Sequence, residues 1–321
     1  MIDACAGTKD FSHIPVLFKE TIEGLNIKPD GVYADGTMGG AGHSSAIAEA
    51  LNENGRLYCF DQDKDAIKAG GERLSRFGEK VTLIHDNFVN MTATLRDRGV
   101  FTADGILLDL GVSSYQLDTA ERGFTYKVDA PLDMRMDDRM IKTAADIVNT
   151  YSKEDLSRIF REYGEERFAG QIANKIVERR AEAPIETTFQ LNDIILSAIP
   201  RKFTVKGGHP SKRTFQAIRI ELNNELTVLT DALPGMIDFL SPGGRLCVIT
   251  FHSLEDRIVK NAFKKAENPC ICPPEFPVCT CGRESLGRVV TRRAILPSEN
   301  EIGENRRAKS AKLRIFERER T

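Results

Sequence analysis

Short apolar runs alternate with longer amphipathic segments over the first third of the chain. The run Gly-Ile-Leu-Leu at residues 105–108 is continuously apolar, as in parallel strands that are buried on both faces. The expected strands lie at residues 32–35, 56–61, 81–85 and 105–109. The expected helices lie at residues 18–25, 44–52, 63–77 and 89–98. Strands that alternate with helices predict right-handed βαβ units in a doubly wound sheet.

A purely helical pattern replaces this alternation in the middle of the chain. Residues 111–138 have the composition of a loop, and amphipathic segments follow without a strand between them. These expected helices lie at residues 144–149, 153–163, 165–180 and 189–198. The sequence therefore predicts an all-α domain inserted at residues 113–213.

The strand pattern resumes towards the C-terminus. A long helical stretch is expected to break at Pro234 and to lead into a tight turn at Ser241-Pro-Gly-Gly. The elements expected here are helices at residues 214–240 and 254–266, a strand at 245–251, and antiparallel edge strands at 289–296 and 312–316. We therefore expect an α/β fold, with a doubly wound, seven-stranded, Rossmann-like sheet built from residues 1–112 and 214–321.

The composition is that of a globular protein. Of the 321 residues, 41% are apolar and 29% are charged, which is ordinary for a soluble chain. No apolar run approaches the ~18 residues of a membrane span. Residues 1–12 lack the basic and apolar regions of a secretory signal. We expect a cytoplasmic protein with no membrane partner.

The net charge of −2 argues against a uniformly basic coat for nucleic acid, but the basic residues are unevenly distributed. Residues 201–219 hold six Lys/Arg and no acid, and residues 283–321 hold eleven Lys/Arg against six Glu. Such local excesses suit contacts with phosphate. A single basic run is nevertheless more often a solvated surface.

A glycine-rich stretch joins the first expected strand to the next helix. Residues 35–43 read Asp-Gly-Thr-Met-Gly-Gly-Ala-Gly-His. Glycines permit positive φ and let a ligand lie directly against the backbone. Asp61, at the tip of the second expected strand, is placed to accept hydrogen bonds from both hydroxyls of a ribose. The two features predict a nucleoside cofactor and disfavour an ordinary tight turn.

The glycine spacing helps to choose between two cofactors. A dehydrogenase would show Gly-x-Gly-x-x-Gly at the start of this helix, and the spacing Gly36-x-x-Gly39-Gly40-x-Gly42 does not match. An acid at the tip of the fourth strand and an edge hairpin after the fifth favour an S-adenosylmethionine methyltransferase. S-adenosylmethionine has no pyrophosphate. The glycine turn therefore needs to let the cofactor lie close to the backbone, and has less need to bind an anion.

Several longer motifs occur in an order that is typical of one family. They are Asp35-Gly-Thr-x-Gly-Gly-x-Gly-His, Asp109-Leu-Gly-Val-Ser-Ser-x-Gln-Leu-Asp, Glu121-Arg-Gly-Phe, Pro131-Leu-Asp-Met-Arg-Met-Asp, Tyr163-Gly-Glu-Glu-Arg-Phe-Ala, Phe215-Gln-Ala-Ile-Arg-Ile, Phe251-His-Ser-Leu-Glu-Asp-Arg-Ile-Val-Lys and Asn305-Arg-Arg-Ala-Lys-Ser-Ala-Lys-Leu-Arg. In these motifs, from His13 to Arg314, the chain resembles the bacterial small-subunit ribosomal RNA cytosine-N4 methyltransferases.

This resemblance implies a reaction and its partners. The reaction is transfer of a methyl group from S-adenosylmethionine to the N4 amine of a cytidine in the decoding region, and the helical insertion binds RNA. The partner is small-subunit ribosomal RNA, either naked or within the assembled subunit; the sequence leaves a homodimer open. By motif position, the cofactor contacts fall on Ala41, Gly42, His43, Asp61, Phe88, Asp109 and Gln116.

Asp109 is the candidate catalytic residue. A cytosine amine is a poor nucleophile because its lone pair is conjugated with the ring, so an acceptor for an amine hydrogen helps the nitrogen to react. Asp109 ends the fourth expected strand, where such an acceptor belongs, but it could equally hold the cofactor's amino group. Ser113 and Ser114 are weaker candidates for base contacts, because hydroxyls at such positions also stabilise turns.

Other side chains could contact a flipped base or a phosphate. His252 could accept a proton or contact phosphate, or could bond to a turn backbone. Arg135 could bind a phosphate, or could form ion pairs with Asp133 and Asp137. The aromatic candidates for stacking on the base, each of which could instead be a core residue, are Tyr115, Phe124 and Phe251.

A cysteine-rich loop stands apart from the expected active site, where we expect no metal. Cysteines in a cytosolic protein are mostly reduced. Cys270-x-Cys272 and Cys279-x-Cys281 supply four soft ligands, enough for a structural zinc ion. Two observations weigh against zinc. The common zinc spacing is Cys-x-x-Cys and not Cys-x-Cys, and the prolines between the two cysteine pairs would stiffen the loop even without a metal. Zinc, reduced thiols and a reversible disulfide all remain open, and only some members of the family carry such a loop.

Two other functions are compatible with parts of this pattern. A nicotinamide dehydrogenase would share the fold, and binding of NAD in place of S-adenosylmethionine would identify it. A ribosome-assembly factor with a degenerate site would need no catalysis. The motif at residues 35–43, together with Asp61 and Asp109, disfavours this second alternative.

Overall fold

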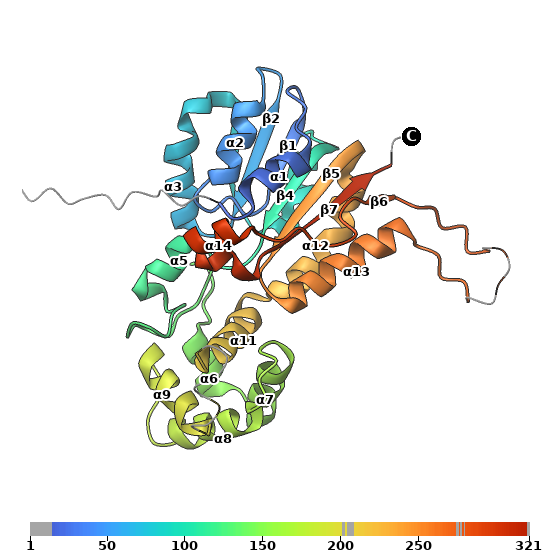
Figure 1. Ribbon diagram of the computed structural model, residues 1–321. Helices are drawn as coiled ribbons and strands as arrows, with labels where there is room; N and C mark the ends of the chain where they lie inside the picture. Colours follow the sequence, from blue (N-terminus) through green and yellow to red (C-terminus); the bar gives the residue numbers. More distant parts are fainter. Residues whose placement is uncertain are drawn as a thin grey trace, which may run out of the picture.

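A seven-stranded sheet forms the centre of the protein (Figure 1). The structure is a computed structural model that describes residues 15–200, 203, 209–273, 276, 278 and 280–319. The strands are β1 (Val32–Asp35), β2 (Arg56–Asp61), β3 (Val81–His85), β4 (Ala103–Asp109), β5 (Leu240–Thr250), β6 (Gly287–Val289) and β7 (Lys312–Arg318). Their order is β3-β2-β1-β4-β5-β7-β6; β1 to β5 are parallel, and β7 is antiparallel to β5 and β6. The expected α/β fold and its antiparallel edge pair are confirmed.

Helices cover both faces of the sheet, because successive side chains of each strand point to opposite sides. In β4, Leu107 belongs to one apolar cluster, whereas Ile106 and Leu108 belong to the other. The helices of the first face are α1 (Phe18–Leu25), α2 (Gly42–Ala50) and α3 (Lys64–Leu74). The helices of the second face are α4 (Met91–Asp97), α12 (Glu225–Phe239) and α13 (Ser253–Glu267). None of the helices in the described ranges is long and apolar enough to span a bilayer.

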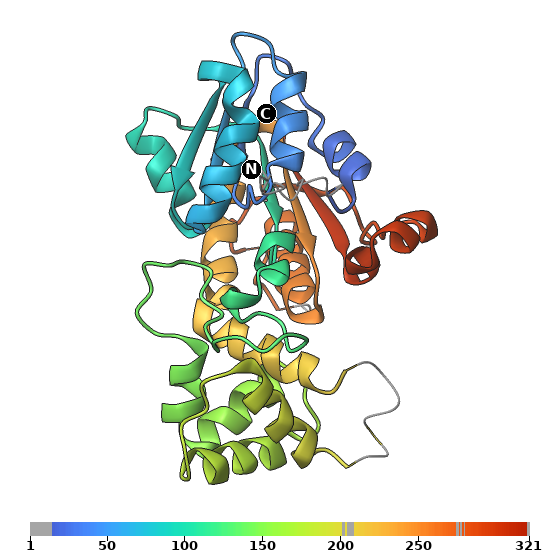
Figure 2. The ribbon, with the colours of Figure 1, turned by 90° about the vertical axis from the view of Figure 1, so that its left-hand side faces the viewer.

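A helical body is inserted between β4 and β5, and it lies below the sheet in Figures 1 and 2. Its helices are α5 (Ser114–Asp118), α6 (Ala144–Thr150), α7 (Lys153–Glu162), α8 (Ala169–Arg180), α9 (Thr188–Ala198) and α11 (Ser211–Asn223). Apolar side chains such as Phe160, Ile176 and Ile218 form a separate buried cluster within it. The short helix η3 (Ala120–Arg122) lies between α5 and α6, and the short helices outside the insertion are η1 (Ser75–Lys80), η2 (Phe88–Asn90), α14 (Glu299–Glu304) and η4 (Arg306–Ser310).

The helix break after the insertion lies at Asn224, not at the expected Pro234. Asn224 has a φ of 50° and separates α11 from α12, and Asn tolerates this left-handed conformation better than most residues. Pro234 lies inside α12, which is held against the sheet by buried side chains such as Leu233 and Ile237. Helix α11 runs from Ser211 to Asn223, so the domain boundary that we drew between residues 213 and 214 falls inside it. Its buried side chains pack in the helical cluster.

Three further boundaries differ from the prediction. The expected tight turn at Ser241 is part of β5, whose register with β4 shifts between Ala103 and Gly105. The edge strand expected at residues 289–296 is not continuous: β6 ends at Val289, and beyond it the chain contacts β7 through Val290, Thr291 and the bridge of Ile295 to Leu313. Helix α8 begins at Ala169 and not at residue 165, since Glu165 has a φ of 48°, which a helix cannot continue through.

Candidate active site

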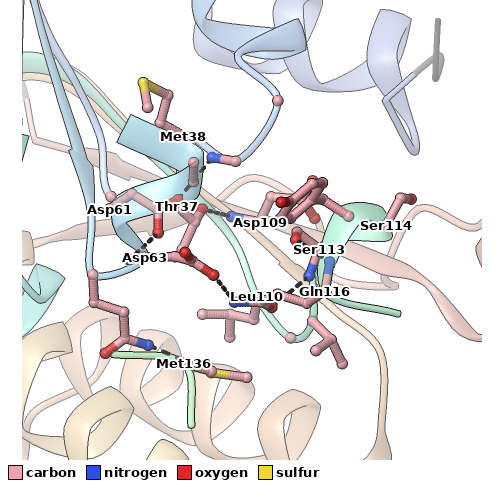
Figure 3. A pocket seen from close by; sticks show the side chains of 18 of the residues that line it. Thr37, Met38, Asp61, Asp63, Asp109, Leu110, Ser113, Ser114, Gln116 and Met136 are labelled. Atoms are coloured by element: carbon pink, nitrogen blue, oxygen red, sulfur yellow. Dashed lines mark hydrogen bonds between the residues drawn. The ribbon is translucent and has the colours of Figure 1, made fainter. Parts of the chain in front are cut away.

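A cavity lies where the carboxyl ends of β1, β2 and β4 meet, the usual ligand position of a doubly wound sheet. Asp35, Asp61 and Asp109 are the last residues of these strands. Figure 3 shows Asp61 and Asp109 on opposite sides of Thr37. The opposite wall includes Met136 and Asn223, which come from the helical insertion. Both parts of the molecule therefore form this cavity.

The glycine-rich turn after β1 is fixed by a buried acid. The Ser44 hydroxyl donates to Asp35 Oδ2 at 2.6 Å, and the Thr37 N–H donates to Oδ1 at 3.1 Å. Burial raises the pKa of Asp35 to about 6. A Cβ on Gly36 would lie 2.5 Å from Leu108 Cδ2, so only glycine lets the turn pack this closely against β4. Asp35 thus shapes the turn and does not itself line the cavity.

Asp61 joins the glycine turn to the end of β2. Its Oδ2 accepts the N–H of Gly39 at 2.8 Å, and its Oδ1 accepts the N–H of Asp63 at 2.9 Å. Gly39 has a φ of +50°, which directs this N–H to the carboxylate. Burial raises the pKa of Asp61 to about 7. Each carboxylate oxygen keeps a second lone pair that can accept a hydroxyl. Asp63, and not Asp61, caps α3.

Asp109 and His43 face each other with unused polar atoms. Asp109 Oδ2 lies 3.7 Å from His43 Nδ1, which is too far for a hydrogen bond. Among the described residues, Asp109 Oδ1 and His43 Nε2 are buried without a hydrogen-bond partner. Burial raises the pKa of Asp109 to about 8, with smaller contributions from Asp35 and Glu255, and burial lowers the pKa of His43 to about 4. Buried polar atoms without partners indicate a site built for a polar ligand.

Gln116 fastens the loop after β4 to the start of α3. Its side-chain amide donates to Asp63 Oδ2 at 2.7 Å, and Arg122 binds the same oxygen at 2.8 Å. The Ser113 hydroxyl caps α5 by accepting the Gln116 N–H, and Gln116 returns a bond to the Ser113 N–H. Ser113 therefore has the structural role that we considered for it.

The cavity brings together most of the predicted cofactor contacts. Ala41 is the exception: it is buried behind the glycine turn with a φ of 58° and does not line the cavity. The predicted residues that line it are Gly42, His43, Asp61, Phe88, Asp109 and Gln116. Met136 and Asn223 were missed as cavity residues. Met136 lies within the motif at residues 131–137, which gives no indication that it reaches the cavity, and Asn223 lies in none of the motifs.

The candidates for base and phosphate contacts divide into two groups. Four of them line the cavity: Ser113, Ser114, Tyr115 and Phe251. Phe124 belongs instead to the buried cluster of the insertion. His252 does not line the cavity, but caps α13 by accepting the Glu255 N–H.

The charged loop that follows the insertion's first residues forms local ion pairs. Arg135 binds Asp133 through two nitrogens, at 2.9 and 2.7 Å. Asp137 pairs with Arg139 at 2.7 Å, and so does not join Asp133 and Arg135 in one network as we considered. These carboxylates therefore satisfy arginines within the loop itself.

A buried group of charged side chains contributes Glu225 and Glu255 to the cavity wall. Arg219 donates to both carboxylate oxygens of Glu225, at 2.7 and 2.9 Å. Glu255 accepts the N–H of Phe251 at 2.8 Å, and its Oε1 lies 3.0 Å from His252 Nε2. Burial opposes ionisation of Glu255, but His252 and the Phe251 N–H keep its pKa below the ordinary value. This negative charge helps to keep Asp109 protonated in the cofactor-free protein.

We expect Asp109 to make the cofactor-free protein less stable as the pH rises from about 7 to 8.5. An unfolded Asp has a pKa near ~3.9, whereas folding raises that of Asp109 to about 8. In this range the folded state holds protons that the unfolded state has lost, so the free energy of unfolding decreases with pH. Thermal unfolding should show a shallower slope for Asp109→Asn than for the unchanged protein or for Asp97→Asn, which alters an exposed residue. Equal slopes in all three would contradict a raised pKa at Asp109.

The sequence was also compared with known proteins. A family model described as the MraW methylase family matches residues 10–319. The ribosomal RNA small subunit methyltransferase H 2 of Agathobacter rectalis is 63% identical over 310 residues, which cover 96% of this chain and 99% of that protein. The ribosomal RNA small subunit methyltransferases H of Lachnospira eligens and Clostridioides difficile are 62% and 55% identical over 309 residues, again 96% of this chain, and 98% and 99% of those proteins.

Proposed function

The chain belongs to the MraW methylase family, and on that basis we propose that it methylates the N4 amine of a cytidine in the decoding region of small-subunit ribosomal RNA. The relatives described above are named for methylation of this RNA, and they match the chain over almost its whole length. The methyl donor is S-adenosylmethionine. The cytidine and its N4 atom are expectations from the sequence motifs.

The residues of the cavity fit such a cofactor. Asp61 offers carboxylate lone pairs to a ribose, and the turn at Gly39 lets the nucleoside lie against the backbone. The partnerless atoms Asp109 Oδ1 and His43 Nε2 can bond the polar groups of the methionine part. When bound, the sulfonium supplies an electrophilic methyl group.

The single observation that carries the proposal is the position of Asp109. Its side chain is 26% exposed at the cavity, and the backbone around it is fixed by the bond from its N–H to Thr37 Oγ1 at 2.6 Å. As a carboxylate, Asp109 can accept a hydrogen of the cytosine amine and so free the nitrogen lone pair for an in-line attack. Alignment by the rigid strand ends supplies the rest of the catalysis.

The cavity wall supplies surfaces for a nucleotide that has left its stack. Tyr115 and Phe251 line the cavity and offer rings for the base. Arg73 and Arg307 also line it and offer positive charge to phosphates. The helical insertion, which we propose binds RNA, reaches the cavity through Met136 and Asn223. The basic residues Arg201, Lys202 and Lys206 lie outside the described residues.

The proposal extends to the biological setting. We propose that the substrate is the RNA within the assembled small subunit, because a folded particle can present the decoding region to both the cavity and the insertion. Such a substrate places the reaction in the cytoplasm. A monomer and a homodimer both fit this arrangement.

Transfer of a labelled methyl group tests the proposed function. Small subunits from a strain that lacks the gene are incubated with the protein and tritium-labelled S-adenosylmethionine, followed by nucleoside analysis; naked ribosomal RNA is a parallel substrate. We expect label in N4-methylcytidine, and more of it with assembled subunits. Label in another nucleoside would overturn the N4 assignment. Binding of NAD in place of S-adenosylmethionine would support a dehydrogenase. Binding of S-adenosylmethionine without transfer of label would support an assembly factor.

A further inference from the structure

A long loop connects α13 to β6, and its described residues include exposed apolar side chains. No helix or strand occurs in the part of residues 268–286 that the structure describes, and the loop extends away from the sheet (Figure 1). Ile271, Phe276 and Val278 in this loop are 64%, 53% and 70% exposed. Long connections of this kind are uncommon unless they have a function or are disordered. Burial of apolar side chains therefore cannot be what orders this loop.

Three thiols nevertheless converge within it. The sulfur atoms of Cys270, Cys272 and Cys281 all lie within 4.8 Å of one another. Those of Cys270 and Cys281 are 3.9 Å apart although eleven positions separate them in the sequence. Two thiolates that share one tetrahedral zinc ion, each at ~2.3 Å, have their sulfur atoms ~3.8 Å apart. The spacing is therefore that of metal ligands.

Cys272 contacts both the backbone and the side chain of Thr280. Its sulfur accepts the Thr280 N–H at 3.3 Å, and the Thr280 hydroxyl lies 3.6 Å away. The thiolate is the form that binds metal, and hydrogen bonds to a ligand atom fix its orientation.

We propose that Cys270, Cys272 and Cys281 bind a structural zinc ion. Soft thiolates select zinc over hard cations such as magnesium and calcium. None of the three lines the active-site cavity, so the ion orders the loop and takes no part in methyl transfer. Cys279 lies outside the described residues; from the sequence alone it is the candidate for the fourth ligand, and a water is the alternative.

Zinc content tests this proposal without reference to activity. The full chain is purified under reducing conditions without chelator, and its zinc is measured by elemental analysis. We expect about one zinc ion per chain. Cys272→Ser should bind zinc at least about tenfold more weakly in a competition with a chromophoric chelator. A variant with Ser at positions 270, 272 and 281 should bind none. Cys247→Ala, which removes a buried strand cysteine, should bind zinc normally.

Two further measurements complete the test. Zinc retained by Cys279→Ser supports three thiolates and a water, and zinc lost by it supports four thiolates. Trypsin cleavage at Arg283, which lies within the loop, should accelerate when zinc is removed from the unchanged protein. The proposal is overturned if that protein binds no more zinc than the triple variant. A disulfide between two of these cysteines in protein purified under reducing conditions, shown by alkylation and mass spectrometry, would also overturn it.

Discussion

Asp109→Ala is expected to abolish methyl transfer and to leave the fold intact. The side chain lies at the cavity with one carboxylate oxygen unpaired among the described residues, so its removal breaks no internal hydrogen bond of that oxygen. Loss of an acceptor that assists proton removal lowers rates by about 10²–10⁴-fold. Single-turnover methylation of small subunits, with saturating S-adenosylmethionine, measures this step directly.

Two companion variants define what Asp109 does. Asp97→Ala alters an exposed residue at the end of α4 and should retain full activity. Asp109→Asn keeps an oxygen acceptor but cannot take up a proton. If Asp109 acts on the base, both Asp109 variants lower the single-turnover rate while the cofactor Kd stays constant. If Asp109 holds only the cofactor, the Kd rises instead. If Asp109→Ala methylates small subunits about as fast as the unchanged protein, Asp109 has neither role.

Asp61→Ala should weaken binding of S-adenosylmethionine by about 10²-fold. Two hydrogen bonds from ribose hydroxyls to a charged acceptor are together worth about 3 kcal/mol, and each 1.4 kcal/mol changes the affinity about tenfold. The substitution also removes the acceptor for the N–H groups of Gly39 and Asp63, so the glycine turn loses its link to β2. Calorimetric titration with S-adenosylmethionine and with S-adenosylhomocysteine measures both affinities.

A neighbouring acid provides the control for Asp61. Asp65 lies in the first turn of α3 and does not line the cavity, so Asp65→Ala should bind the cofactor normally. The loss in Asp61→Ala should be similar for both ligands, because they share the ribose. A loss confined to S-adenosylmethionine, or no loss at all, would show that the ribose lies elsewhere.

The strand ends of the site were predictable because local sequence defines them. Asp35, Asp61 and Asp109 each close a short apolar run, and parallel strands bring their carboxyl ends to one edge of the sheet. The hydrogen bond from the Gly39 N–H to Asp61 follows from the same arrangement, because the turn after β1 and the end of β2 lie at that edge. In contrast, Ala41 has the motif position of a cofactor contact, but its left-handed backbone turns it into the core.

Other features depended on long-range packing. Asn223 accepts the Met136 N–H at 2.9 Å and donates to the carbonyl of Met134 at 3.0 Å, across more than eighty positions of sequence. Nothing near Asn223 in the sequence indicates this pairing. The amphipathic pattern likewise runs through Asn224 without interruption, so only the backbone conformation of that one residue reveals that α11 and α12 are separate helices.

The joint at Asn224 has a mechanical consequence. It is a single non-helical residue between α11, which packs in the insertion, and α12, which packs on the sheet. Helix α11 has 13 residues, so at ~1.5 Å per residue it is a stiff lever about 20 Å long. A rotation of about 10° at Asn224 moves its far end by about 3 Å. A small torsional change at this one residue would therefore shift the far end of α11 relative to the sheet, and the hydrogen bonds from Asn223 to the Met134–Met136 segment oppose such a shift.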